Sequence, residues 1–130
     1  MARVASKNTL PEIRLRKFLH GRGLRYRLHV KSLVGNPDIV LAKHNAVIQV
    51  RGCFWHQHTC SKGRIPSSNR DYWVPKLTRT KQRDNENDRK LIEQGWRLWI
   101  VWECQMQGRE LLEIVGEQLI GEITNTAKLH

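Results

Sequence analysis

The positions of the three cysteines limit most strongly how this chain can fold. Cys53 and Cys60 lie in one short polar loop, and Cys104 follows an apolar segment much later in the sequence. The loop also contains His56 and His58, and from the spacing either imidazole can complete a closed tetrahedral set of ligands for structural Zn²⁺. The alternative is that the cysteines are simply buried as small apolar residues. We expect zinc, and we expect it to pin the loop to the end of a sheet and to contribute to folding.

The spacing of apolar residues predicts a mixed β-sheet flanked by helices. We expect helices over residues 9–21, 71–94 and 109–123, and strands over 25–30, 38–42, 46–50 and 97–102. Two of these strands form a hairpin that is apolar on much of both faces, so the hairpin should lie centrally in the sheet. The order helix, strand, hairpin, helix, strand, helix predicts an α/β fold, in a single domain over residues 1–130.

The two later helices have distinct apolar patterns. The long polar helix has few candidate inward contacts, which are Trp73, Leu77, Leu91 and Ile92, and Pro75 fits only in its first turn. The last helix is amphipathic, and its apolar residues are Leu111, Leu112, Ile114, Val115, Leu119 and Ile120. We expect these apolar side chains to pack against the sheet.

The charge of the chain indicates a polyanionic partner. Its 130 residues carry 23 Lys and Arg against 12 Asp and Glu, a formal net charge of +11. Nucleic acid is the expected partner, since neutralised phosphates release counterions; the alternative is that the charge serves only solubility. No apolar run is long enough for a membrane span or a signal peptide, so we expect a cytoplasmic protein without membrane contact.

A candidate magnesium site lies where two buried strands meet a loop. Asp38 begins one strand and Val50 lies near the end of its hairpin partner. A carboxylate at such an edge can bind Mg²⁺, which prefers oxygen ligands; the alternative is a Pro-Asp turn without chemistry. His56 can act as general base for attack on a phosphodiester if His58 is the zinc ligand.

Several aromatic residues lie where they can contact nucleic acid. Phe54 and Trp55 follow Gly52 in the polar loop, and Trp73 lies at the start of the long helix. Aromatic side chains of a basic protein can wedge between base pairs or stack on bases. Trp96, Trp99 and Trp102 lie at or in a strand instead, so the core is the better interpretation for them.

Four segments together resemble the very short patch repair endonucleases, a bacterial family. They are the run Gly-Cys-Phe-Trp-His (52–56), Asn-Pro-Asp (36–38), Trp-Glu-Cys (102–104) and the opening Ser-Lys-Asn-Thr-x-Pro-Glu (6–12). The resemblance covers residues 1 to about 107. It implies a restriction-endonuclease-like fold, and an Mg²⁺-dependent enzyme that nicks duplex DNA 5′ of the T in a T:G mismatch left by deamination of 5-methylcytosine.

The resemblance also implies a role for individual residues. The magnesium ligands would be Asp38 and the main-chain carbonyl of Val50, and the essential histidine would be His56, assisted by Glu12. The zinc ligands would be Cys53, His58, Cys60 and Cys104. The intercalating aromatics would be Phe54, Trp55 and Trp73. From its sequence context alone, Glu12 is better explained as part of a capping box with Thr9.

Two departures from the family pattern bear on activity. Relatives often carry Thr-His or Val-Asp before the Gly-Cys pair, whereas this chain has Val50-Arg51. Arg51 cannot act as a base or a metal ligand, but it can hold a DNA phosphate. The basic arm that relatives carry ahead of the residues matching Met1 is expected to be short or missing here.

The function expected from these residues is mismatch nicking by a monomer, with a mismatch-repair protein as a possible further partner. The main alternative is a zinc-stapled DNA-binding module whose catalysis is impaired by Arg51. A sequence-specific restriction enzyme is a third reading, and it predicts double-strand cuts in fully paired DNA.

Overall fold

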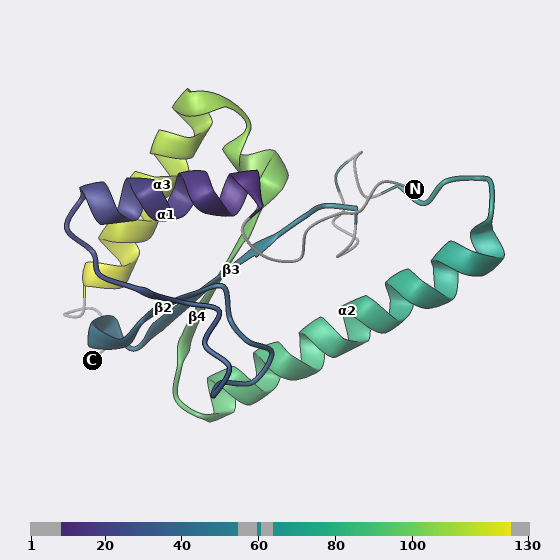
Figure 1. The fold of residues 1–130 in the computed structure, drawn as a ribbon, viewed down its shortest axis with the longest axis horizontal. Helices are drawn as coiled ribbons and strands as arrows, with labels where there is room; N and C mark the ends of the chain where they lie inside the picture. Colours follow the sequence, from purple (N-terminus) through teal and green to yellow (C-terminus); the bar gives the residue numbers. More distant parts are fainter. Residues whose placement is uncertain (1–8, 55–59, 61–63, 126–130) are drawn as a thin grey trace.

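A computed structural model describes residues 9–54, 60 and 64–125. In this part of the chain, three helices and four strands follow in the order α1 (Leu10–Gly21), β1 (Arg27–Leu28), β2 (Ile39–Leu41), β3 (Ala46–Arg51), α2 (Arg70–Glu93), β4 (Arg97–Trp102) and α3 (Gly108–Thr124). Two short 3₁₀ turns, η1 (Ala42–His44) and η3 (Glu103–Met106), follow β2 and β4. This arrangement confirms the predicted α/β class (Figure 1).

The sheet is mixed, and its strand order is β1-β2-β3-β4. β2 pairs antiparallel with β1 and with β3, while β3 and β4 are parallel. The hairpin therefore lies at the centre, as its apolar faces predicted. Asn45 closes the hairpin turn in the left-handed conformation, with φ 53°, which Asn tolerates better than most residues.

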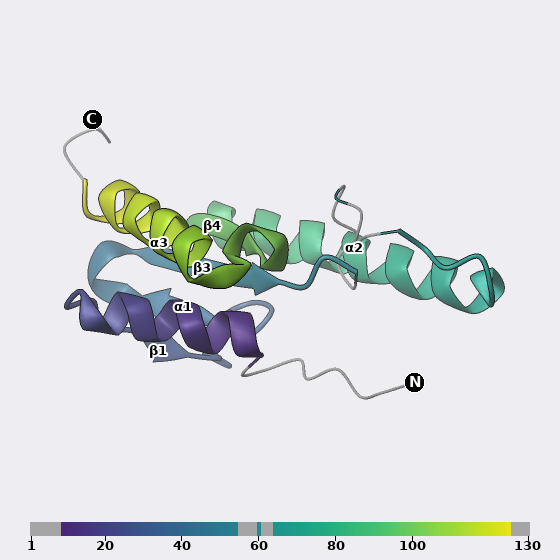
Figure 2. The same ribbon diagram turned by 90° about the horizontal axis from the view of Figure 1, so that it is seen from above.

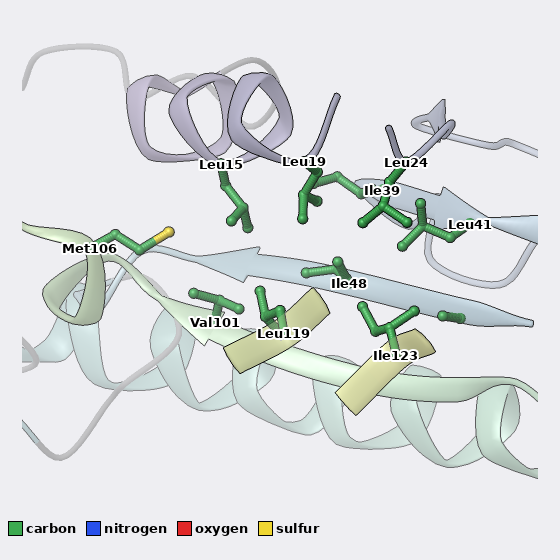
Figure 3. Packing of buried hydrophobic residues seen from close by; sticks show 11 residues of the cluster. Leu15, Leu19, Leu24, Ile39, Leu41, Ile48, Val101, Met106, Leu119 and Ile123 are labelled. Carbon is green, nitrogen blue, oxygen red and sulfur yellow. The ribbon is translucent and has the colours of Figure 1, made fainter. Parts of the chain in front are cut away.

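Alternating residues of the hairpin build two separate cores. Ile39, Leu41 and Ile48 belong to one cluster with residues of α1 and α3, and Figure 3 shows Ile39 beside Leu19 and Leu24 of the α1 side. Val40 and Val47 point to the other face of the sheet, where they pack with Val30 and with Leu91 near the end of α2. Because side chains alternate along a strand, β2 and β3 can contribute to both faces and lie buried between them.

The long helix α2 contacts the sheet through its C-terminal half, and its N-terminal half projects past the end of β3 (Figures 1 and 2). The helix begins at Arg70, so Pro75 lies beyond the first turn that was expected to hold it. Pro75 is exposed there. Because proline has no backbone N–H, one intrahelical hydrogen bond is missing near the N-terminus of the helix. Among the described residues, no helix is both long and apolar enough to cross a membrane.

Three apolar residues predicted to face the core are exposed. They are Ile92, Leu111 and Ile114, with exposed fractions of 58%, 44% and 56%. Each helix packs against the rest of the protein along one stripe only, and neighbouring residues fill that stripe: Leu91 in α2, and Leu112, Val115 and Leu119 in α3. Helical periodicity identified the amphipathic segments, but the packing of neighbouring helices decided which stripe is buried.

The first predicted strand is shorter than expected. Alternation predicted a strand over residues 25–30, but β1 contains only Arg27 and Leu28. His29 still donates its backbone N–H to the carbonyl of Asp38 at 3.2 Å. Its φ of 48° then turns the chain out of the extended conformation, which ends the strand.

Candidate active site and metal centres

Asp38 is fixed at the start of β2 by two hydrogen bonds to the end of β3. The backbone N–H of Asp38 donates to Gln49 Oε1 at 3.1 Å, and the N–H of Val50 donates to Asp38 Oδ2 at 2.8 Å. Gln49 is almost fully buried, and the Asp38 side chain is 17% exposed. The two hydrogen bonds hold the carboxylate beside the backbone of Val50, while leaving it accessible from one side.

Glu12 reaches the same place from α1, and it is not part of a capping box. The N-cap residue Thr9 makes no side-chain cap hydrogen bond, so the interpretation of Glu12 as part of a capping box was wrong. Glu12 is only 2% exposed and accepts a hydrogen bond from Arg16 Nη1 at 2.9 Å. The helix face that carries Glu12 is turned toward the interior, so the carboxylate is satisfied by a side chain one turn later instead of by the helix N-terminus.

His29 lies between the two carboxylates, and no pattern in the sequence marked it as a candidate site residue. Its Nε2 is 3.2 Å from Glu12 Oε2, and its Nδ1 is 3.9 Å from Asp38 Oδ1. Strand alternation had placed His29 on a polar face with Arg27. The signal that could have found His29 is the register between β1 and β2. Arg27 pairs with Val40 and Leu28 with Ile39, so the next pair is His29 with Asp38.

Glu12, His29 and Asp38 therefore form a compact group of possible metal ligands. One ligand atom from each lies within 4.8 Å of the others. Ligands on opposite sides of one Mg²⁺ are separated by about 4 Å, so the group has the size that a single cation can bridge with small adjustments. Carboxylate oxygens suit Mg²⁺, and the adjacent Val50 backbone could add a carbonyl oxygen.

The three cysteines gather at the C-terminal ends of β3 and β4. Parallel pairing of Arg51 with Trp102 brings Cys53 level with Cys104, two residues beyond each strand. The sulfur atoms of Cys53, Cys60 and Cys104 lie within 4.8 Å of one another, which fits ligands around one tetrahedral Zn²⁺. The predicted fourth ligand, His58, lies outside the described residues.

Cys53 is the most enclosed of the three thiols. It has no exposed surface, and its backbone N–H donates to Glu103 Oε1 at 3.0 Å. Burial, reinforced by the neighbouring thiols of Cys60 and Cys104, raises the pKa of Cys53 to about 12. Without a cation, this group favours the neutral thiol; a bound metal ion would supply the positive charge that stabilises the thiolate.

Two of the three predicted wedge aromatics lie in contact. The rings of Phe54 and Trp73 are 5.2 Å apart between centroids, in an edge-to-face arrangement. Trp73 also meets Tyr72 edge-to-face at 4.9 Å, and Tyr72 is 55% exposed. The structure thus joins the loop after β3 to the start of α2 through an aromatic cluster. Trp55, like the predicted general base His56, falls outside the described residues.

Arg51 lies at the end of β3 and is paired with acidic residues of α2. Its Nη2 is 2.6 Å from Asp88 Oδ1, and its Nε is 4.0 Å from Asp84 Oδ2. The side chain is 10% exposed. The sequence predicted a contact between Arg51 and DNA, which stays a prediction. The observed contacts give Arg51 a role in joining β3 to α2, close to both metal-ligand groups.

Comparison with known proteins identifies a consistent set of relatives. A family model described as DNA mismatch endonuclease Vsr matches residues 1–62. The chain is 42% identical over 123 residues to a type II nicking enzyme, V.NmeAIP, of Neisseria meningitidis serogroup A, covering 95% of this chain and 88% of the relative. It is 45% identical over 113 residues to the type II nicking enzyme V.XorIIP of Xanthomonas oryzae, covering 87% and 83%. It is 40% identical over 121 residues to the DNA mismatch endonuclease Vsr of Escherichia coli, covering 92% and 78%.

Proposed function

The chain belongs to the Vsr family of DNA mismatch endonucleases, and from this premise we propose that it nicks one strand of duplex DNA 5′ of the T in a T:G mismatch. The observation that carries the proposal is the meeting of Glu12 and Asp38, from α1 and the start of β2, in a group that one cation can bridge. This group adjoins the strand end that leads into the cysteine loop. The formal charge of +11 supports DNA as the substrate.

Asp38 and the main-chain carbonyl of Val50 would hold the catalytic Mg²⁺. When bound, that cation supplies positive charge for the phosphate oxygens in the transition state. The hydrogen bond from Val50 N–H to Asp38 Oδ2 supports this role, because it fixes the carboxylate before any ligand binds. Glu12 would orient the attacking water, and His56 would accept its proton. Attack on phosphorus breaks the bond to the 3′ oxygen and leaves 5′-phosphate and 3′-hydroxyl ends.

A structural Zn²⁺ would be held by Cys53, His58, Cys60 and Cys104. The proximity of the three thiols supports this proposal. Their position, in the loop after β3 and directly after β4, indicates what the metal ion would stabilise. Cys53 and Cys60 lie at the two ends of the segment that contains His56, whereas Cys104 is attached to the sheet through β4. A metal ion would cross-link the two and so keep the loop near Asp38.

Phe54, Trp55 and Trp73 would enter the duplex beside the mismatch. The contact between Phe54 and Trp73 supports a joint wedge built from the loop and from α2. Insertion of aromatic side chains unstacks a base step, which costs least where pairing is already weakened. We propose that the protein binds DNA as a monomer. Contact with a mismatch-repair protein is a further proposal, which pull-down experiments test.

A nicking assay tests the proposed function directly. The full chain is incubated with Mg²⁺ and an end-labelled duplex that contains one T:G mismatch, and a T:A duplex of the same sequence serves as substrate control. We expect one nick, on the T strand of the mismatched duplex only. Asp38→Ala and His56→Ala should abolish nicking and retain binding, while the control Glu113→Gln, an exposed carboxylate change on α3, should retain both nicking and binding.

The outcomes separate the proposal from its alternatives. Mismatch binding without nicking by the unchanged protein would favour a DNA-binding module with impaired catalysis. Double-strand cuts in the T:A duplex would favour a restriction enzyme. Full nicking by Asp38→Ala would remove Asp38 from the mechanism altogether.

A further inference from the structure

His29 has two features that a purely structural histidine does not need. Its Nε2 is buried and has no hydrogen bond among the described residues, although Glu12 Oε2 is 3.2 Å away, because the ring nitrogen is not aligned with that oxygen. Its backbone has a φ of 48°, in the left-handed region that side chains with a Cβ rarely adopt. Backbone strain of this kind persists where surrounding structure enforces it, and it is common at functional sites.

The surroundings of the ring explain what the strained position achieves. The left-handed turn follows directly after β1 and leaves the imidazole 86% buried, between a carboxylate from α1 and a carboxylate from β2. Both ring nitrogens lie within 4.0 Å of a carboxylate oxygen, Nε2 at 3.2 Å from Glu12 and Nδ1 at 3.9 Å from Asp38. Neither contact is a hydrogen bond, since Nε2 has no hydrogen-bond partner among the described residues and Nδ1 is too far from its oxygen.

We infer that His29 supplies an imidazole nitrogen to the divalent cation attracted by Glu12 and Asp38. The inference rests on the proposed function, because it adds a ligand to the same cation. The three side chains each offer a ligand atom within 4.8 Å of the others, so one ion can be shared. The centre is then a mixed nitrogen–oxygen site and not a site of oxygen ligands alone.

The added nitrogen has a consequence for the choice of metal. Mg²⁺ strongly prefers oxygen ligands and gives up its waters reluctantly. Imidazole binds first-row transition ions more readily, so a nitrogen ligand shifts the preference toward Mn²⁺. Mn²⁺ is also a selective probe of this centre, because thiolate ligands such as the three cysteines favour softer ions.

The test measures metal binding in the full chain, as purified with any metal on its cysteines. Mn²⁺ affinity is obtained from the electron paramagnetic resonance signal of the free ion, and Mg²⁺ affinity from its competition with Mn²⁺. Electron spin echo modulation then reports whether nitrogen is bonded to Mn²⁺. The variants are His29→Gln, which keeps a polar side chain but removes the imidazole, and His44→Gln, which changes a histidine at the opposite end of β2.

We expect the unchanged protein and His44→Gln to show nitrogen modulation and equal affinities. His29→Gln should lose the modulation and bind Mn²⁺ about ten-fold more weakly, with a smaller change for Mg²⁺. Equal weakening for both ions, or modulation that persists in His29→Gln, would show that His29 only positions the carboxylates and would overturn the inference. Unaltered thermal unfolding of the variants without added Mn²⁺ or Mg²⁺ serves as the check on folding.

Asp38→Asn distinguishes failure of this inference from failure of the proposed function. If Asp38→Asn abolishes binding of both ions while His29→Gln changes neither, the metal site stands and His29 is not its ligand. If Asp38→Asn binds both ions as the unchanged protein does, the proposed catalytic site itself is wrong.

Discussion

Breaking the ion pair between Arg51 and Asp88 should destabilise the protein measurably. Arg51 Nη2 lies 2.6 Å from Asp88 Oδ1, and the side chains are 10% and 18% exposed. The pair connects the last residue of β3 with the C-terminal part of α2, the helix whose first turn carries Trp73. Removing either partner leaves a mostly buried charge without its nearest counter-ion. This lowers the free energy of unfolding by more than the intact pair adds to it.

The expected magnitude follows from the burial of the pair. Loss of one partner from a fully buried ion pair costs about 3–5 kcal/mol, whereas an exposed pair contributes about 1 kcal/mol or less. Asp88→Asn should lower the free energy of unfolding by about 1.5–3 kcal/mol, less than for a fully buried pair, because the site is partly exposed. Asp84 Oδ2, 4.0 Å from Arg51 Nε, also remains as a second counter-charge. Arg51→Met should cost more, about 3 kcal/mol, since both carboxylates lose the guanidinium.

Urea unfolding followed by tryptophan fluorescence, at one fixed Zn²⁺ concentration, measures these values. The two single variants and the double variant form a cycle, and we expect a coupling energy of about 1 kcal/mol or more. The matched control is the pair Arg89–Glu93 on the same helix, with exposed fractions of 64% and 61%, whose coupling should stay below about 0.5 kcal/mol. Equal coupling in the two cycles would refute the structural role assigned to Arg51.

Four further predictions concern packing, catalysis, metal binding and stability at alkaline pH. Gly116→Ala should destabilise the protein by about 1–3 kcal/mol in thermal unfolding, because the new methyl group overlaps the ring of Phe18, whereas Gly121→Ala on the same helix has open space and should be neutral or stabilising. Glu12→Gln should lower the nicking rate about 10²-fold and leave T:G duplex binding unchanged; an unchanged rate would return Glu12 to a structural role. Because the pKa of Cys53 is raised from 9.0 to about 12, Zn²⁺ binding near pH 7 should release its proton, and calorimetry in buffers of different ionisation enthalpy should detect this. In the metal-free protein the same shift favours folding below pH 9, and that contribution should be lost as the pH rises toward 12; an alkaline unfolding profile without such a loss would contradict it.

The candidate site was predictable from the sequence only in part. Asp38 and Cys53 were identifiable from local patterns, because Asp38 begins a buried strand and Cys53 opens a ligand-rich loop that follows its hairpin partner. Glu12 had a local explanation, the capping box, that the fold overrules by turning its carboxylate inward. His29 had no local signal, since alternation along β1 assigned it to the polar face and only a left-handed φ brought it between the two carboxylates.

The sequence by itself determined the secondary structure, the mixed sheet and the gathering of the cysteines. The secondary structure and the sheet depend on short-range periodicity, while the gathering of the cysteines was predicted from the ligand types found in one loop and just after the last strand. Only the tertiary structure decided which stripe of each helix is buried, and how Arg51 is paired with α2. Both depend on side chains that come from distant segments and compete for the same space and the same counter-charges, and that competition is settled only when the chain is packed.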